Sequence, residues 1–175
     1  MQFRITGLTM AALGGATIVP AAAQAQTLDV TVTLPRLTVA EYHKPYVAIW
    51  LEKPGSPATT LTVWYDVDKR NNGGAKWLSD VRMWWRASGR TLSLPADGVS
   101  GATRAPGPQK LSFVAGRGKM PALTPGAYTL VVEAAREAGG RELVRVPFTL
   151  SAAGTARGSA AGKAELGAVT LNVHR

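Results

Sequence analysis

The chain has 175 residues, with 20 Lys and Arg against 11 Asp and Glu, two histidines and no cysteine. Without cysteine it cannot form disulfides, thiolate zinc sites or cysteine-held iron–sulfur clusters, and two histidines argue against a multi-histidine metal or haem site. The net charge of +9 comes from scattered residues with no nucleic-acid-binding signature, which predicts a basic surface rather than a nucleic-acid-binding protein.

The first 25 residues are typical of a secretory signal peptide. Arg4 supplies the positive charge, residues 5–19 form a short apolar run, and Ala23-Gln24-Ala25 fits the small-x-small cleavage rule. We predict cleavage after Ala25 and export to the periplasm of a bacterium. The alternative is a membrane anchor, but glycines interrupt the short run, and no later segment is apolar enough to span a bilayer.

The mature part, residues 26–175, has the length of one domain and begins with strand patterns. Residues 28–34 alternate between apolar and polar side chains, as a half-buried strand does. Residues 46–52 and 60–66 are two further strand-forming runs. The Pro-Gly-Ser-Pro turn at 54–57 predicts that these two runs form a hairpin.

The middle of the chain is less regular. A polar loop is expected at 66–74, and tryptophans at helical spacing predict a short helix over 76–87. A short strand around 92–94 precedes a long turn-rich loop at 95–109.

Strand patterns return in the last third of the chain. We expect strands at 111–115, 128–134, 141–150 and 168–173, the middle two joined by a turn at Gly139-Gly140. The segment 151–163 is rich in Ala, Gly and Ser and is expected to be flexible. Seven or eight short strands with at most one short helix predict an all-β fold, an immunoglobulin-like antiparallel β-sandwich.

One segment of the 95–109 loop carries recognisable chemistry: Asp97-Gly98-Val99-Ser100-Gly101-Ala102-Thr103. The glycines permit a tight turn, and the small residues before Thr103 leave its hydroxyl open. Arg104 follows directly. An open hydroxyl beside a cation, in a glycine-rich loop with successive N–H groups, is suited to receive a phosphate. A plain surface turn explains the glycines and prolines of this loop equally well.

The segment resembles the D-x-x-[S/T]-G-A-T motif of proteins that carry covalent flavin, such as subunits of the sodium-pumping NADH:quinone reductase and of the Rnf complex. In those proteins an ApbE-type flavin transferase joins FMN, taken from FAD, to the motif threonine through a phosphoester bond. The resemblance implies an FMN acceptor at Thr103 and assigns Asp97, Ser100, Gly101 and Ala102 to recognition by the transferase. Only the seven-residue motif is shared, because the chain lacks the larger fold of those subunits.

Most of the mature chain also resembles a bacterial family of predicted periplasmic proteins of unknown function. The resemblance rests on P-Y-V-A-I-W, a tryptophan-rich middle, D-G-V-S-G-A-T-R-A-P-G and P-G-x-Y-x-L-x-V-E-A-x-R-E. That family is often encoded beside PepSY-type membrane proteins and flavin transferases. The resemblance therefore implies a periplasmic flavoprotein that exchanges electrons with a PepSY-type membrane partner, a carrier rather than an enzyme acting on small molecules.

A flavin ring needs aromatic or apolar faces. Trp50 and Trp64 lie in predicted strands and are expected in the core. Trp84 and Trp85 are neighbours whose side chains diverge, so one of them is a candidate to be exposed and cover the ring. Arg104 is a candidate to meet the phosphate or the flavin.

A second function stays open: a non-enzymatic, immunoglobulin-like binding or interaction module of the periplasm, with exposed strand edges for a partner. A hydrolase function is not supported, because the sequence shows no paired catalytic residues. The polar loop at 66–74 has the wrong ligand order for calcium and no closing glutamate, so no metal site is predicted.

Overall fold

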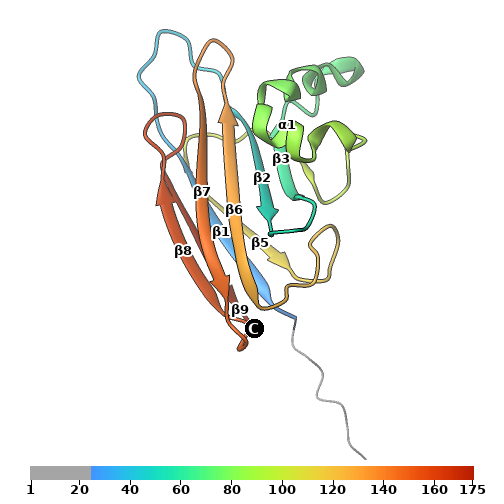
Figure 1. Ribbon diagram of the computed structural model, residues 1–175. Helices are drawn as coiled ribbons and strands as arrows, with labels where there is room; N and C mark the ends of the chain where they lie inside the picture. The colour runs from blue at the N-terminus through green and yellow to red at the C-terminus, as the bar shows by residue number, and fades with distance from the viewer. Residues whose placement is uncertain (1–24) are drawn as a thin grey trace, which may run out of the picture.

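The computed structural model describes residues 25–175, so all of the predicted signal peptide except Ala25 lies outside the described residues. Two sheets pack face to face as a β-sandwich (Figure 1). The first sheet has the order β5-β1-β9-β8, formed by β1 (Thr27–Leu34), β5 (Gly107–Val114), β8 (Ala156–Ala161) and β9 (Ala168–His174). The second has the order β4-β3-β2-β6-β7, formed by β2 (Tyr46–Glu52), β3 (Thr59–Tyr65), β4 (Ser100–Ala102), β6 (Gly126–Ala135) and β7 (Arg141–Leu150). The predicted all-β sandwich is confirmed.

Hydrophobic alternation explains the strands that face the inter-sheet core. In β1 the apolar positions Leu28, Val30, Val32 and Leu34 are all buried while the intervening residues are half-buried. The two predicted hairpins are present, since β2 pairs with β3 and β6 pairs with β7, both antiparallel.

A hydrogen-bonded tyrosine supports the immunoglobulin-like character of the sandwich. The Tyr128 hydroxyl donates to the Thr124 carbonyl (2.9 Å) and accepts from the Thr124 N–H (3.1 Å). A tyrosine that bonds the backbone a few residues upstream is the tyrosine corner of such sandwiches. The Tyr128 ring also stacks on Phe148 at 5.4 Å, which ties the corner into the core.

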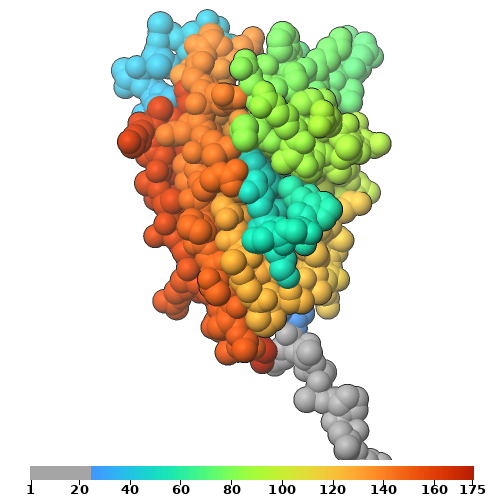
Figure 2. All heavy atoms as spheres, viewed as in Figure 1, coloured from blue at the N-terminus to red at the C-terminus, as the bar shows by residue number. Residues whose placement is uncertain are grey.

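A helical segment covers the outer face of the second sheet over β2, β3 and part of β6, so β2 and β3 are buried on both sides, whereas β7 alternates between buried and exposed residues. It comprises the 3₁₀ segment η1 (Arg70–Asp80), the helix α1 (Arg82–Ala87) and the 3₁₀ turn η2 (Gly89–Thr91). Figure 2 shows this segment (green) beside the upper part of β6 and β7 (orange). A second core lies between the segment and the sheet, formed by Ala48, Trp50, Val63, Tyr65, Leu78, Val81, Trp84, Val99 and Val131.

The buried carboxylate of Glu133, on β6, fixes the helical segment to the sheet. Its Oε2 accepts the backbone N–H groups of Met83 and Trp84, both at 2.9 Å. These N–H groups lie in the first turn of α1, where a helix leaves donors without internal partners. Glu133 therefore supplies from the sheet the N-terminal cap that the helix sequence lacks.

The expected helix over 76–87 is divided in the structure. Val81 has φ −79° and ψ 70°, which is not helical, so η1 ends before it and α1 begins after it. The expected strand at 92–94 is absent, and that stretch is irregular.

Two short strands appear where irregular chain was expected. β4 lies inside the 95–109 loop and pairs parallel to β3, so the second sheet is mixed rather than wholly antiparallel. β8 lies inside the 151–163 segment and pairs with β9. Small residues allow β8 to pack closely: a Cβ added at Gly158 would lie 2.8 Å from Val146 Cγ1.

The connection between β8 and β9 is held by Glu142, on β7. Its carboxylate accepts the backbone N–H groups of Lys163, Ala164 and Leu166. Partial burial acts to raise the pKa of Glu142, but these hydrogen bonds outweigh it, and the pKa lies below its ordinary value of 4.5.

Replacing Glu142 with Gln is expected to lower the free energy of unfolding at neutral pH by about 1–2 kcal/mol. A carboxylate whose folded pKa is depressed stabilises the protein above its unfolded pKa, and that contribution is lost as the pH falls through the folded pKa. Urea unfolding at neutral and at acid pH should therefore show that the variant loses less stability on acidification than the wild type. Equal losses would contradict the role given to Glu142.

Candidate functional site

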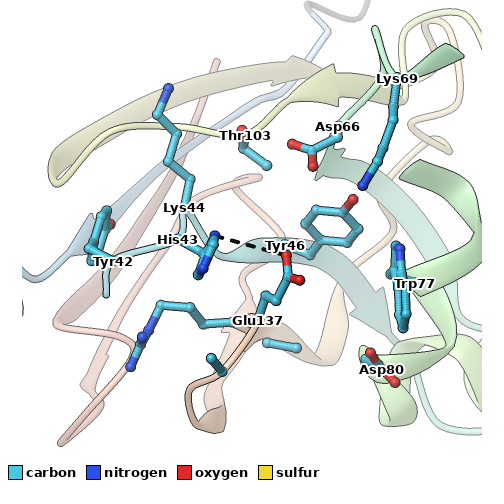
Figure 3. Close-up of a pocket in the computed structure, with 13 residues that line it drawn as sticks. Tyr42, His43, Lys44, Tyr46, Asp66, Lys69, Trp77, Asp80, Thr103 and Glu137 are labelled. Atoms are coloured by element: carbon cyan, nitrogen blue, oxygen red, sulfur yellow. Dashed lines mark ion pairs between the residues drawn. The ribbon is translucent and has the colours of Figure 1, made fainter. Parts of the chain in front are cut away.

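A pocket of about 520 Å³ lies at one end of the sandwich, where four separate stretches of chain meet. These are residues 42–46, residues 66–80, Thr103 and the β6–β7 turn. In Figure 1 this is the upper end, whereas the C-terminus and the start of β1 lie at the lower end. The C-terminus and the start of β1 are thus remote from the pocket (Figure 1). Figure 3 shows the side chains that line it.

The short strand β4 positions Thr103 at this pocket. β4 pairs with the end of β3, with Tyr65 opposite Ala102. Thr103 and Asp66 are the next residues on the two chains, so they lie side by side, and both line the pocket. Thr103 is partly exposed. Its hydroxyl-bearing side chain is therefore accessible from the cavity.

The turn before β4 is closed by Ser100. The Ser100 N–H donates to the Ala96 carbonyl (2.9 Å), and the Ser100 hydroxyl accepts from the Ala96 N–H (3.0 Å) and from Tyr65 (3.4 Å). Gly98, at φ +70°, lies within this turn. The Ser100 hydroxyl is therefore engaged in holding the motif in shape.

The other motif residues divide between packing and exposure. A Cβ at Gly101 would lie 3.3 Å from Trp64 Cδ1, so glycine lets β4 lie against the buried indole. Asp97 and Ala102 are exposed. Of the five specified motif positions, Thr103 alone lines the pocket, whereas Asp97 and Ala102 face solvent.

Trp84 and Trp85, the candidates from the sequence for covering a flavin ring, lie away from the pocket. Trp84 is fully buried, and its Nε1 donates to Thr60 Oγ1 at 2.9 Å. Trp85 is partly buried with its ring 6.1 Å from that of Trp84. Neither lines the pocket with Thr103. Trp50 and Trp64 are buried in the core, as predicted.

Trp77 is the tryptophan that lines the pocket, and it was not among the candidates predicted from the sequence. Its side chain is 55% exposed, on η1, and Tyr42 and Tyr46 lie on the other walls. The spacing of Trp77, Val81 and Trp84 predicts one short helix over 76–87. The structure instead places Trp77 on η1 and Trp84 on α1, separated by the non-helical Val81, and no spacing rule in the sequence signals such a break.

The cations at the pocket also differ from the candidate given by the sequence. Arg104 is exposed, with its guanidinium carbon 5.2 Å from the centre of the Trp64 ring, and it does not line the pocket. Lys44 and Lys69 do line it. Figure 3 shows these two lysines extending along the walls on either side of Thr103.

Arg136 lines the pocket, but its charge is already paired. It forms two hydrogen bonds with Glu165, from Nε (2.9 Å) and Nη2 (3.0 Å), and Glu165 also accepts the Gly140 N–H (2.8 Å). Both side chains are almost completely buried. The pair fastens the β6–β7 turn to the β8–β9 connection and so makes one rigid wall of the pocket.

The remaining walls carry an imidazole, a carboxylate and a phenol. His43 Nε2 donates to Glu41 (2.8 Å), and its Nδ1 lies 3.9 Å from Glu137, the ion pair drawn in Figure 3. Burial, together with the negative charge of Asp66, raises the pKa of Tyr46 to about 12. The Tyr46 phenol is therefore protonated throughout the physiological pH range, and its hydroxyl lies beside Asp66.

Fold and site together define an all-β domain with an aromatic-lined, small-molecule-sized pocket at one end of the sandwich. Residues 27–168 match the family model described as predicted periplasmic protein (DUF2271), and the chain belongs to this family. The protein is periplasmic. Neither a curated protein nor a solved structure matches the chain. Within residues 25–175, no helix has both the length and the apolar character needed to cross a membrane.

Proposed function

We propose that this protein is a periplasmic redox carrier to which FMN is attached covalently at Thr103, and which exchanges electrons with membrane-bound partners. One observation carries the proposal: the threonine of the flavin-attachment motif lies on the wall of a pocket of about 520 Å³. If the motif were only a surface turn, its threonine would not need to line a cavity.

The residues present fit the cofactor. The volume lies within the range of roughly 300–1,000 Å³ that is usual for small-molecule sites. Tyr46 and Trp77 offer aromatic faces for a flat ring, and Lys44 and Lys69 offer positive charge for a phosphoester. The carboxylate of Asp66, beside Thr103, opposes a phosphate, so the lysines have to offset it.

Attachment uses FAD as the co-reactant and an ApbE-type transferase as the enzyme. The Thr103 oxygen forms a bond to the phosphorus of the FMN half, the bond from that phosphorus to AMP breaks, and AMP leaves. The threonine proton is released to the transferase or to water. Once bound, FMN supplies one- and two-electron redox chemistry, and the protein sets its exposure and its partners.

A carrier fits this site better than an enzyme that turns over a second substrate. The pocket lies at the end of the sandwich and its Trp77 wall is half exposed, so a group held there is within reach of a docking protein. A membrane protein of the PepSY type is the partner we propose.

The proposal is tested by producing the protein in a periplasm with and without an ApbE-type transferase. Flavin fluorescence should remain with the chain after denaturation only when the transferase is present. The native product should be reduced by dithionite and reoxidised by ferricyanide, a one-electron acceptor. If a transferase that is active on another target leaves this chain without flavin, the proposal fails and the immunoglobulin-like binding module becomes the better account.

A further inference from the structure

We propose that Trp77 is the residue on which the isoalloxazine ring of the Thr103-linked FMN stacks. The inference rests on the proposed function and extends it to the position of the ring. It begins from an unusual exposure: Trp77 leaves 55% of its surface open to solvent, whereas Trp50, Trp64 and Trp84 are fully buried. A large indole that is half exposed on the wall of a pocket is the kind of group that a ligand covers.

The other aromatic groups near the pocket are less suited to this role. Tyr46 lies edge-on to Tyr65, with ring centres 6.3 Å apart, and its ring is only partly exposed. Tyr42 is exposed but offers a smaller ring. Figure 3 shows Thr103 above Tyr46 and Trp77 beyond Tyr46 on the neighbouring wall. A ring tethered at Thr103 therefore reaches the indole by extending across the pocket.

The position of Trp77 relative to Thr103 is set by close backbone packing. A Cβ added at Gly74 would lie 2.1 Å from the Asp66 carbonyl oxygen, so η1 is seated directly on the chain that leaves β3. Asp66 is in turn the neighbour of Thr103 across the β3–β4 pairing. Leu78, next to Trp77, is fully buried in the second core. The backbone that carries the indole is therefore packed against the sheet on both sides of Trp77, at Gly74 and at Leu78.

Because FMN would be tethered covalently, weak stacking would be enough to keep its ring in the pocket. A group on a short linker is presented to its site at an effective concentration on the order of millimolar. Weak contacts then keep the ring in the pocket, and removal of the one large stacking face is enough to release it. Release is observable because an indole in contact with a flavin ring quenches the flavin's emission.

The experiment compares wild type, Trp77→Leu, Trp77→Phe and Trp85→Leu, each co-produced with the transferase. Intact mass is measured first, and only chains loaded with FMN are compared. Flavin emission per loaded chain should be low in the wild type and in Trp85→Leu and should rise several-fold in Trp77→Leu. Trp77→Phe, which keeps a flat ring, should fall between wild type and Trp77→Leu. The circular dichroism of the flavin bands should weaken in Trp77→Leu, because the freed ring loses its fixed orientation.

Equal emission from loaded wild type and loaded Trp77→Leu would overturn the role of Trp77 and leave FMN attachment standing. A rise of the same size in Trp85→Leu would also overturn it, because that indole does not line the pocket. If no variant and no wild-type chain gains the mass of FMN, the proposed function itself fails and this inference fails with it.

Discussion

Thr103→Ala is expected to abolish covalent flavin loading completely. Thr103 is the one motif residue that lines the pocket, so the substitution removes the motif's only side-chain hydroxyl there. The Ser100 hydroxyl cannot replace it, because it is hydrogen-bonded to Ala96 and Tyr65. Thr103 follows the end of β4 and is partly exposed, so the free energy of unfolding should change by no more than about 0.5 kcal/mol. Flavin fluorescence of the denatured chain measures the loading, and urea unfolding measures the stability.

Thr91→Ala is the matched control for this variant. Thr91 is also an exposed threonine, but it lies in η2, outside the motif, and its hydroxyl donates to the Ser88 carbonyl (2.9 Å). Its loading should equal that of the wild type. Flavin that remains covalently bound to Thr103→Ala would show that another residue is the acceptor.

Glu133→Ala is expected to cost about 3 kcal/mol of stability, the largest effect on folding that we predict. The substitution leaves the part-buried N–H of Met83 and the buried N–H of Trp84 without their partner and removes a buried side chain from beneath α1. Each buried donor left unsatisfied costs about 1–3 kcal/mol. The helical segment should loosen first, because Glu133 ties it to β6. Urea unfolding and hydrogen exchange of the α1 amides measure the two effects.

Glu137→Ala is the control for the effect on stability. Glu137 lies in the β6–β7 turn, with its side chain 76% exposed, so its removal should change the free energy of unfolding by about 0.5 kcal/mol at most. If both substitutions have equally small effects, Glu133 does not anchor the helical segment.

Much of the sandwich could be predicted because its strands follow simple patterns. The alternation in β1 and the Gly139-Gly140 turn between β6 and β7 both reflect local rules that hold in the structure. Trp50 and Trp64 lie in strand-forming runs and are buried. Where only one face of a strand packs on the core, the alternation of apolar residues in the sequence directly predicts which side chains are buried.

The strands that escaped prediction are those whose residues have no strand preference of their own. β4 is Ser-Gly-Ala, and β8 is made of small residues with one arginine. Both form because a neighbouring strand offers a partner, β3 for the first and β9 for the second. Local strand propensity cannot predict such pairing, because it depends on a neighbouring strand rather than on the residues of the strand itself.

Of the residues that line the pocket, the sequence analysis proposed only Thr103 for a role at the site. The motif identified Thr103 because the pattern lies within seven consecutive residues. The walls come from stretches as distant as Tyr46, Trp77 and Arg136, and only the fold brings these together. The divergence of adjacent side chains favours Trp84 or Trp85 as the exposed indole, but Trp84 is buried and Trp85 is partly buried, whereas Trp77 is 55% exposed. The expected helix over 76–87 is also divided at the non-helical Val81.

The central claim is that Thr103 carries FMN, and the most direct measurement is the intact mass of the mature protein made with an active ApbE-type transferase and with an inactivated one. We predict a gain of one FMN less one water with the active enzyme only, located by peptide mapping on the peptide that contains Thr103. An unchanged mass beside a second target that the same transferase does load would contradict the claim.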